Sequence, residues 1–135
     1  MPKVGIGLMV SVWVAWAAPA LGIERVAPKT AAAQVTAGQA VLVDVREASE
    51  LRAEGSAAPA TWLAKSSVDG TDTAFKAFLK AHDKKRPLYF YCGSGRRAEA
   101  VAKQFEALGY HVGNVGSFDD WKEAGLPVKA VPVPK

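Results

Sequence analysis

The sequence predicts an α/β fold, with a central, mostly parallel sheet flanked by helices on both faces. Short apolar runs alternate along the chain with segments of helical periodicity, which is typical of this class. The two strongest runs, AVLVDV (residues 40–45) and PLYFYC (residues 87–92), are apolar on both faces. Such runs indicate central strands of a parallel sheet, because helices cover both sides of these strands.

Two further strands complete the predicted sheet. HVGNV (residues 111–115) is a weaker strand, and a fourth is expected near residues 61–63. Ligands of such sheets bind beyond the carboxyl ends of the strands. Residues 44–46 and Cys92 both lie at such ends. We therefore expect the sheet to bring them to one edge.

Three helices are expected in the part of the chain that precedes Cys92. Thr30 can cap an alanine-rich helix that ends near Gly38, and Ser49 can open a short helix through residue 54. A third helix begins at Thr71 or Asp72, and its apolar side chains are spaced for one buried face.

Two more helices follow the cysteine. Residues 97–108 carry apolar side chains at helical spacing, and Gly109 supplies a left-handed stop. Ser117 and Asp120 form a capping box for a last helix, which Gly125 closes.

Residues 1–20 resemble an export signal rather than a part of the fold. A basic residue precedes an apolar stretch, and Ala18 and Ala20 are the small residues that a signal peptidase reads, so cleavage is expected after Ala20, with Gly22 as the alternative. A retained membrane anchor is the competing interpretation. The apolar stretch 4–18 is shorter than the ~20 residues of a spanning helix, which favours cleavage. We therefore expect an exported, periplasmic protein without stable membrane association after cleavage.

The remaining 115 residues (135 minus 20) suffice for one domain, residues 21–135, with a proline-rich tail from about residue 129. Without Lys3 this part has 16 basic and 13 acidic residues, a net charge of about +3. Much of the basic excess lies in the turn 84–86 and in the tail, which is typical of a solvated surface. We therefore expect no binding of nucleic acid.

Cys92 is the single cysteine of the sequence. It can form no disulfide within the chain, and an unpaired cysteine in an exported protein indicates a reactive thiol or a bridge to another molecule. The alternative is a small buried apolar residue, as free cysteines often are.

The residues after this cysteine favour the reactive thiol. Gly93, Ser94 and Gly95 can adopt the backbone angles of an anion-binding nest, and the positive end of the next helix adds to its field. Such surroundings stabilise the thiolate, which is the form in which cysteine reacts. Arg96 and Arg97 can hold an anionic substrate, although either one can instead solvate the exposed face of the helix.

Three motifs together resemble the rhodanese domain, and in particular its small single-domain exported sulfurtransferases. LVDVRE (residues 42–47) resembles the first signature of that family, and NVGSFDDWKEAGLPV (residues 114–128) its closing signature. Between them, YCGSGRRAEAVAKQFEALGY (residues 91–110) resembles the active-site loop and the helix that follows it. The resemblance spans residues 30–128 in the family's order, and it implies the rhodanese-like fold.

The resemblance implies that Cys92 takes a sulfane sulfur from thiosulfate or a related small anionic donor and becomes a persulfide. The sulfur then passes to cyanide or another thiophilic acceptor, for which a protein is an alternative. The reaction needs no metal and no organic cofactor, and His82 and His111 lack metal-ligand spacing. The backbone amides of residues 93–97 are expected to surround the persulfide. Two alternatives are a persulfide carrier and a non-catalytic binding module on the same scaffold.

The length of the loop distinguishes branches of the family that this sequence resembles. Four residues separate Cys92 from Arg97, as in the sulfur-transferring members, whereas the related phosphatases and arsenate reductases have five. A wider loop suits a tetrahedral oxyanion, so phosphatase activity is not expected.

Other positions resemble supporting residues of the family. Asp44 resembles an aspartate that hydrogen-bonds near the active loop, and Arg46 an arginine that pairs with surrounding carboxylates; both are expected behind the site. Trp121 matches a core tryptophan. Two residues depart from the pattern: Ser56 stands where a histidine is usual, and Ser117 stands where a glycine is usual. These departures bear on packing and substrate access rather than on the reaction.

Overall fold

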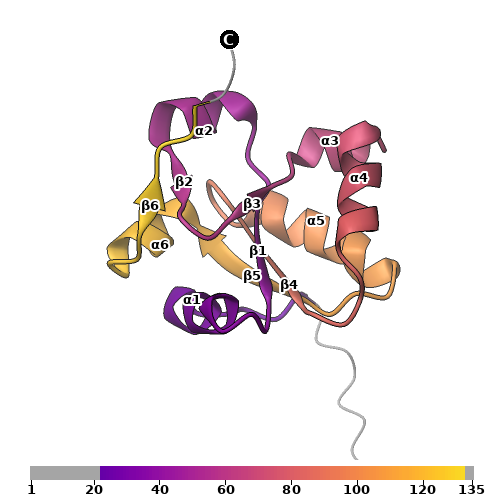
Figure 1. Cartoon of the computed structure of the whole chain (residues 1–135), viewed down its shortest axis with the longest axis horizontal. Helices are drawn as coiled ribbons and strands as arrows, with labels where there is room; N and C mark the ends of the chain where they lie inside the picture. Colours follow the sequence, from indigo (N-terminus) through magenta and orange to yellow (C-terminus); the bar gives the residue numbers. More distant parts are fainter. Residues whose placement is uncertain (1–21, 133–135) are drawn as a thin grey trace, which may run out of the picture.

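The computed structural model describes residues 22–132, and its main sheet has four parallel strands (Figure 1). They are β1 (Val41–Asp44), β3 (Thr61–Trp62), β4 (Leu88–Cys92) and β5 (Val112–Ser117), in the order β3-β1-β4-β5. Each strand pairs in parallel with its neighbour, which confirms the predicted fold class. The predicted signal peptide, residues 1–20, lies outside the described residues.

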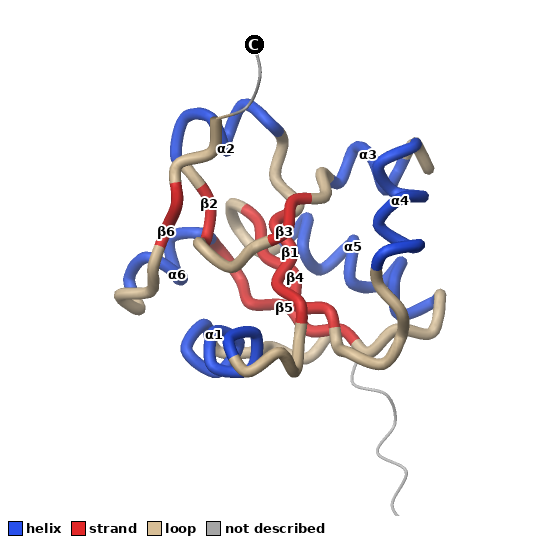
Figure 2. Tube along the Cα trace, in the orientation of Figure 1, coloured by secondary structure: helices blue, strands red, loops and turns tan. Residues whose placement is uncertain are grey.

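Helices cover both faces of this sheet, as predicted (Figures 1 and 2). On one face lie α3 (Lys65–Asp69), α4 (Thr73–Ala81) and α5 (Arg96–Ala107), and on the other lie α1 (Pro28–Thr36) and α6 (Phe118–Glu123). The helix α2 (Ala48–Glu54) follows β1 directly and lies beyond the carboxyl ends of the strands. This end of the sheet is where ligands of parallel sheets bind.

Two hydrophobic cores, one on each face, hold the layers together. Successive side chains of a strand point to opposite faces. Phe90 and Cys92 accordingly belong to the core under α5, whereas Tyr91 belongs to the core under α1 and α6. Trp121 is fully buried in that second core, where its predicted packing role is confirmed.

The predicted helix ends are largely confirmed. Asp72 caps α4 by accepting a hydrogen bond from the amide of Phe75. Ser117 and Asp120 form the predicted capping box of α6, so the serine found in place of a glycine holds a helix start. Gly109 follows α5 in the left-handed region, with φ of +96°.

Two predicted helix starts are wrong. Thr30 lies inside α1, which begins at Pro28, because proline fits the first helical position, where its missing NH leaves no bond unmade. Glu47, rather than Ser49, caps α2, and it forms a reciprocal capping box with Glu50.

The sequence patterns also missed α3 and a second, antiparallel sheet. This sheet pairs β2 (Ser56–Ala57) with β6 (Val128–Lys129), so the predicted proline-rich tail begins with a strand. Each of the two strands is only two residues long, too short to give a recognisable alternation.

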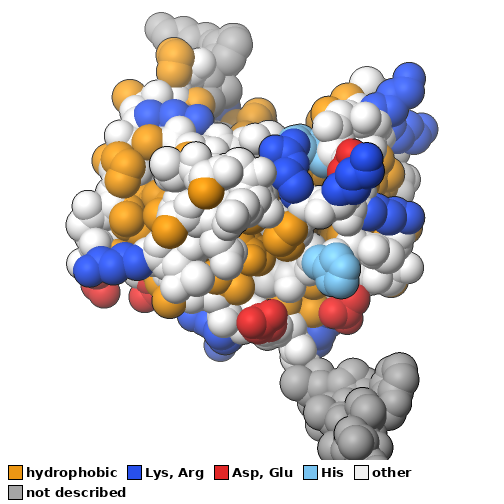
Figure 3. Space-filling model, turned by 60° about the horizontal axis from the view of Figure 1, so that its bottom comes forward, with side chains coloured by type: hydrophobic (Ala, Val, Ile, Leu, Met, Phe, Trp, Pro, Cys, Tyr) orange, Lys and Arg blue, Asp and Glu red, His pale blue; other side chains and the backbone are white. Residues whose placement is uncertain are grey.

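Charged side chains are spread over the surface. Figure 3 turns the lower side of Figure 1 forward, and there lysine and arginine side chains stand in separate groups with acidic side chains near them. That face therefore presents no continuous basic stripe. Within residues 22–132, none of the helices has the length and apolar character needed to cross a membrane.

Candidate active site around Cys92

Cys92 ends β4 and packs against α5. None of its surface is exposed to solvent. Its Sγ accepts hydrogen bonds from the amides of Gly95, at 2.9 Å, and Ala98, at 3.4 Å. The sulfur is therefore buried, as an apolar cysteine is, and also held by backbone donors, as a reactive one is. Such donors stabilise negative charge on the atom they face.

Glycine shapes the loop between β4 and α5, which crosses the end of the sheet (Figure 2). Gly95 adopts a left-handed φ of +92° directly before α5, a conformation that favours glycine. The backbone amides of Gly93, Ser94 and Arg97 donate no hydrogen bond to any of the described residues. These free amides stand next to the two that hold Sγ and at the positive end of α5. The loop therefore suits an anion.

Arg97 pairs with a carboxylate that the sequence patterns did not reveal. Its Nη1 and Nη2 donate to the two carboxylate oxygens of Glu50 at 2.7 and 2.8 Å. These hydrogen bonds lower the pKa of Glu50 to about 2 and raise the pKa of Arg97. The guanidinium lies over the loop, since a Cβ built on Gly93 falls 2.9 Å from Nη2. Arg97 therefore lies at the site, and its ion pair with Glu50 offsets part of its positive charge there.

Arg96 is placed differently. Its side chain is exposed, and it makes no hydrogen bond or ion pair with any of the residues from 22 to 132. The guanidinium is therefore free to meet a ligand at the start of α5 or to remain solvated.

We expect Glu50→Gln to change how the stability of the domain depends on pH. The pKa of Glu50 in the folded protein is about 2, below its ordinary 4.5. The pair with Arg97 therefore contributes in full above about pH 4.5, and its contribution is lost as the pH falls toward about 2. Urea unfolding at several pH values measures this, with Glu106→Gln, an exposed residue of α5, as the control. If acidification lowers the free energy of unfolding of the wild type no more than that of Glu50→Gln, the ion pair does not stabilise the domain.

Asp44 and Arg46 do not lie against the loop. Asp44 stands opposite Tyr91, the neighbour of Cys92, so its side chain points to the other face of the sheet. Arg46 donates to both oxygens of Asp44, at 2.8 to 3.3 Å, and to Glu54 at 3.1 Å. Arg46 therefore pairs with carboxylates, as predicted, and Asp44 lies behind the site, where it accepts a hydrogen bond from Tyr91 next to the active loop.

Ser56 completes this buried network at the position where a histidine was expected. Its Oγ donates to Asp44 at 2.8 Å and lies 2.8 Å from the hydroxyl of Tyr91. That hydroxyl donates to the same carboxylate at 2.6 Å. Burial, followed by the charge of Asp44, raises the pKa of Tyr91, so the phenol stays protonated. The network therefore ties the end of β1 to the residue that precedes Cys92.

No metal centre accompanies the cysteine in the part of the chain from 22 to 132. No three side chains of His, Cys, Asp or Glu there stand close enough together to hold an ion.

One family model covers most of the chain. The model of the rhodanese-like domain family matches residues 27–124. No curated protein matches the chain.

Solved structures share the fold. A rhodanese-related protein from Thermoplasma volcanium is 21% identical over 80% of this chain and 99% of its own, with a TM-score of 0.64. A rhodanese-like domain protein from Staphylococcus aureus is 22% identical over 79% of this chain and 99% of its own, with a TM-score of 0.62. A protein of unknown function from Rhodopseudomonas palustris, described as a possible tyrosine phosphatase, is 23% identical over 79% of this chain and 85% of its own, with a TM-score of 0.65. At these identities the structures establish the fold alone.

Proposed function

The chain belongs to the rhodanese-like domain family, and on that premise we propose that it is a sulfurtransferase that carries sulfane sulfur on Cys92. The observation that carries the proposal is the double hydrogen bond from the amides of Gly95 and Ala98 to Sγ. A cysteine that served only as core packing has no need of backbone donors aimed at its sulfur.

In the first step, the Cys92 thiolate attacks the outer sulfur of thiosulfate or a related anionic donor. A bond forms between Sγ and that sulfur, the S–S bond of the donor breaks, and sulfite leaves with its electron pair. The free amides of Gly93, Ser94 and Arg97 offer donors for the charge on the transferred sulfur. Arg96 and Arg97 attract the dianionic donor.

In the second step, cyanide attacks the outer sulfur of the persulfide. The S–S bond at Cys92 breaks, thiocyanate leaves, and the thiolate is restored. Charge is balanced in both steps without a metal or organic cofactor. Because Sγ has no exposed surface, either substrate reaches it only after the loop or the pair of Arg97 and Glu50 moves.

The predictions about location and partners extend this proposal. Export to the periplasm, with cleavage of residues 1–20, places the thiol where small anionic sulfur compounds are the donors. The acceptor is then a small thiophile or another protein, and neither nucleic acid nor a membrane takes part.

Treating the purified domain with thiosulfate and measuring its intact mass tests the proposal. We expect a gain of one sulfur atom, with release of sulfite, and then loss of that sulfur to cyanide as thiocyanate. Loading without discharge by cyanide indicates a persulfide carrier that serves a protein acceptor. No loading with any sulfane donor contradicts sulfur transfer and favours a binding module.

We expect Arg97→Ala to raise the KM for thiosulfate by about tenfold or more, since a hydrogen bond to a charged group contributes about 1.5–3 kcal/mol. Arg86→Ala removes the same charge from an exposed turn and is the control. Because Arg97→Ala also leaves Glu50 unpaired, the double variant Arg97→Ala/Glu50→Gln separates donor binding from folding. Steady-state thiocyanate formation measures the effect. A double variant with the wild-type KM contradicts a role for Arg97 in donor binding.

A further inference from the structure

The first described residues form a short extension of the sheet beside β5. Arg25 and Asn114 form a parallel bridge, in which the amide of Asn114 donates to Glu24 at 2.8 Å and the amide of Val26 donates to Asn114 at 3.0 Å. The amide of Ile23 donates to Glu99 of α5 at 2.9 Å. A segment about seventy positions before Cys92 in sequence is therefore fixed against β5 and α5, which flank the loop.

Arg25 in this extension touches the active loop. A Cβ built on Gly95 falls 3.4 Å from its Nη1, and one built on Gly116 falls 2.7 Å from its Nη2. Both glycines have positive φ, +92° and +101°, so the absence of side chains at these two positions leaves room for the guanidinium. Gly95 is also a donor to Sγ, and thus a single residue separates Arg25 from the sulfur of Cys92.

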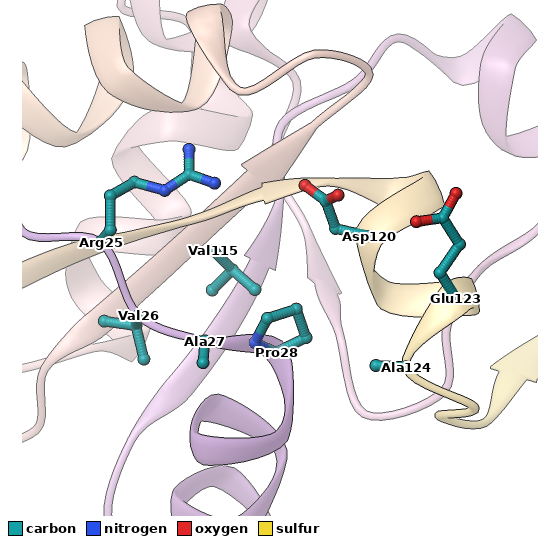
Figure 4. Close-up of a pocket in the computed structure, with 8 residues that line it drawn as sticks. All are labelled: Arg25, Val26, Ala27, Pro28, Val115, Asp120, Glu123 and Ala124. Atoms are coloured by element: carbon teal, nitrogen blue, oxygen red, sulfur yellow. The ribbon is translucent and has the colours of Figure 1, made fainter.

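Arg25 also forms one wall of a pocket of about 510 Å³ between the extension and α6 (Figure 4). Its lining includes Arg25, Val26, Pro28, Val115, Asp120 and Glu123. Figure 4 shows the guanidinium on one side of the opening and the two carboxylates on the other, with apolar side chains below them.

Arg25 and Asp120 stand close together in this pocket without a direct ion pair, since a Cβ built on Gly116 falls 2.7 Å from Nη2 of Arg25 and 2.6 Å from Oδ2 of Asp120. Arg25 forms no ion pair within the described part of the chain. Asp120 accepts the amide of Ser117 at 3.0 Å, and Glu123 is exposed without a hydrogen-bond partner among residues 22–132. A cation and two anions thus face a shared space with an apolar floor, which is complementary to a small zwitterion.

We propose that this pocket binds the charged end of a small aminothiol that accepts sulfur from Cys92. The carboxylate of the acceptor pairs with Arg25, and its ammonium group pairs with Glu123 and Asp120. The inference rests on the proposed function, because the acceptor is the second substrate of that reaction.

The transfer itself is balanced. The acceptor thiol gives its proton to solvent, and its thiolate attacks the outer sulfur of the Cys92 persulfide. A new S–S bond forms on the acceptor, the S–S bond at Cys92 breaks, and Cys92 leaves as the thiolate. No oxidant or reductant is consumed.

Four thiols test the pocket: cysteine, cysteamine without the carboxylate, 3-mercaptopropionate without the ammonium group, and 2-mercaptoethanol without either. The protein is first loaded with sulfur from thiosulfate, and the rate at which each thiol removes that sulfur is measured. For each thiol, the rate with a variant is divided by the rate with the wild type, so that the intrinsic reactivity of the thiol cancels. We expect Arg25→Gln to slow discharge by cysteine and 3-mercaptopropionate about fivefold, the size expected for loss of an exposed charge pair. Glu123→Gln should slow cysteine and cysteamine by a similar factor. Arg52→Gln, on exposed α2 surface, is the control.

Equal effects of each variant on all four thiols overturn the inference, since a general loss of reactivity does not depend on the charge of the acceptor. Chemical-shift mapping with S-methylcysteine on the unloaded protein gives an independent test. Shifts that gather at Arg25, Val115 and Glu123 support the pocket, and shifts elsewhere or none overturn it. A protein that never loads sulfur contradicts the proposed function, and this mapping then decides the pocket by itself.

Discussion

Replacing Cys92 by serine is expected to abolish sulfur loading, with activity falling to the level of buffer alone. The chain has no other cysteine, so no second thiol can take over the sulfur. A hydroxyl does not form a persulfide, although it keeps an acceptor within reach of the amides of Gly95 and Ala98. The fold should therefore survive, with a change in the free energy of unfolding of about 1–2 kcal/mol at most.

Intact mass after thiosulfate treatment and thiocyanate formation measure this loss, and urea unfolding measures the stability. Ser94→Ala is the matched control, because it alters the exposed tip of the same loop and leaves the thiol in place. Sulfur transfer that persists in Cys92→Ser contradicts the assignment of the nucleophile. A variant that loses both activity and fold indicates that Cys92 acts through packing.

Replacing Arg46 by methionine is expected to destabilise the domain by about 3–5 kcal/mol, the usual cost of removing one partner of a buried ion pair. Arg46 is 1% exposed and Asp44 is 0% exposed, so Asp44 is left charged and uncompensated. The guanidinium also lies 4.3 Å from the ring centre of Phe118, and that contact is lost. For a domain of this size, the change lowers Tm by roughly 15 °C or more.

Calorimetry on Arg46→Met and on the double variant Asp44→Asn/Arg46→Met separates the two causes. If most of the destabilisation comes from the unpaired carboxylate of Asp44, the double variant recovers part of the lost stability, because it no longer carries that charge. Arg52→Ala, an exposed arginine of the nearby helix α2, should change stability by no more than about 0.5 kcal/mol. A single variant as stable as Arg52→Ala contradicts the importance of the buried network.

The fold was predictable because its strands and longer helices carry their own signals. PLYFYC is apolar on both faces, and α5 has apolar residues at helical spacing followed by Gly109, so both elements could be recognised locally. The two-residue strands β2 and β6 carry no such pattern, and their pairing depends on the packing of segments far apart in sequence. Thr30 was mistaken for a cap because a residue type that caps helices also occurs inside them.

The site was predictable in its centre and not in its surroundings. The order of strand, cysteine, glycines and helix indicated that backbone amides face the sulfur, and Gly95 does so. Ala98 was missed because its amide reaches Sγ only through the first turn of α5. Glu50 and Arg25 were missed because their contacts with the loop come from tertiary packing, which no local pattern records.

The resemblance placed Asp44 near the active loop, but it did not reveal its hydrogen-bond partner. The alternation of side chains along β1 and β4 points Asp44 to the core opposite that of Cys92, so it accepts a hydrogen bond from Tyr91 beside the loop rather than from the loop itself. Its register opposite Tyr91, rather than opposite Cys92, decides this. Register of that kind cannot be read from a single strand.

Amide NMR spectra before and after loading with thiosulfate test most directly whether backbone donors hold the reactive sulfur. The gain of one sulfur atom in the intact mass should be accompanied by the largest shifts at Gly95 and Ala98 and at the free amides of Gly93, Ser94 and Arg97. Addition of cyanide should reverse these shifts, and Cys92→Ser should show none of them. A protein that gains the sulfur while these amide resonances stay in place contradicts the role of the backbone donors.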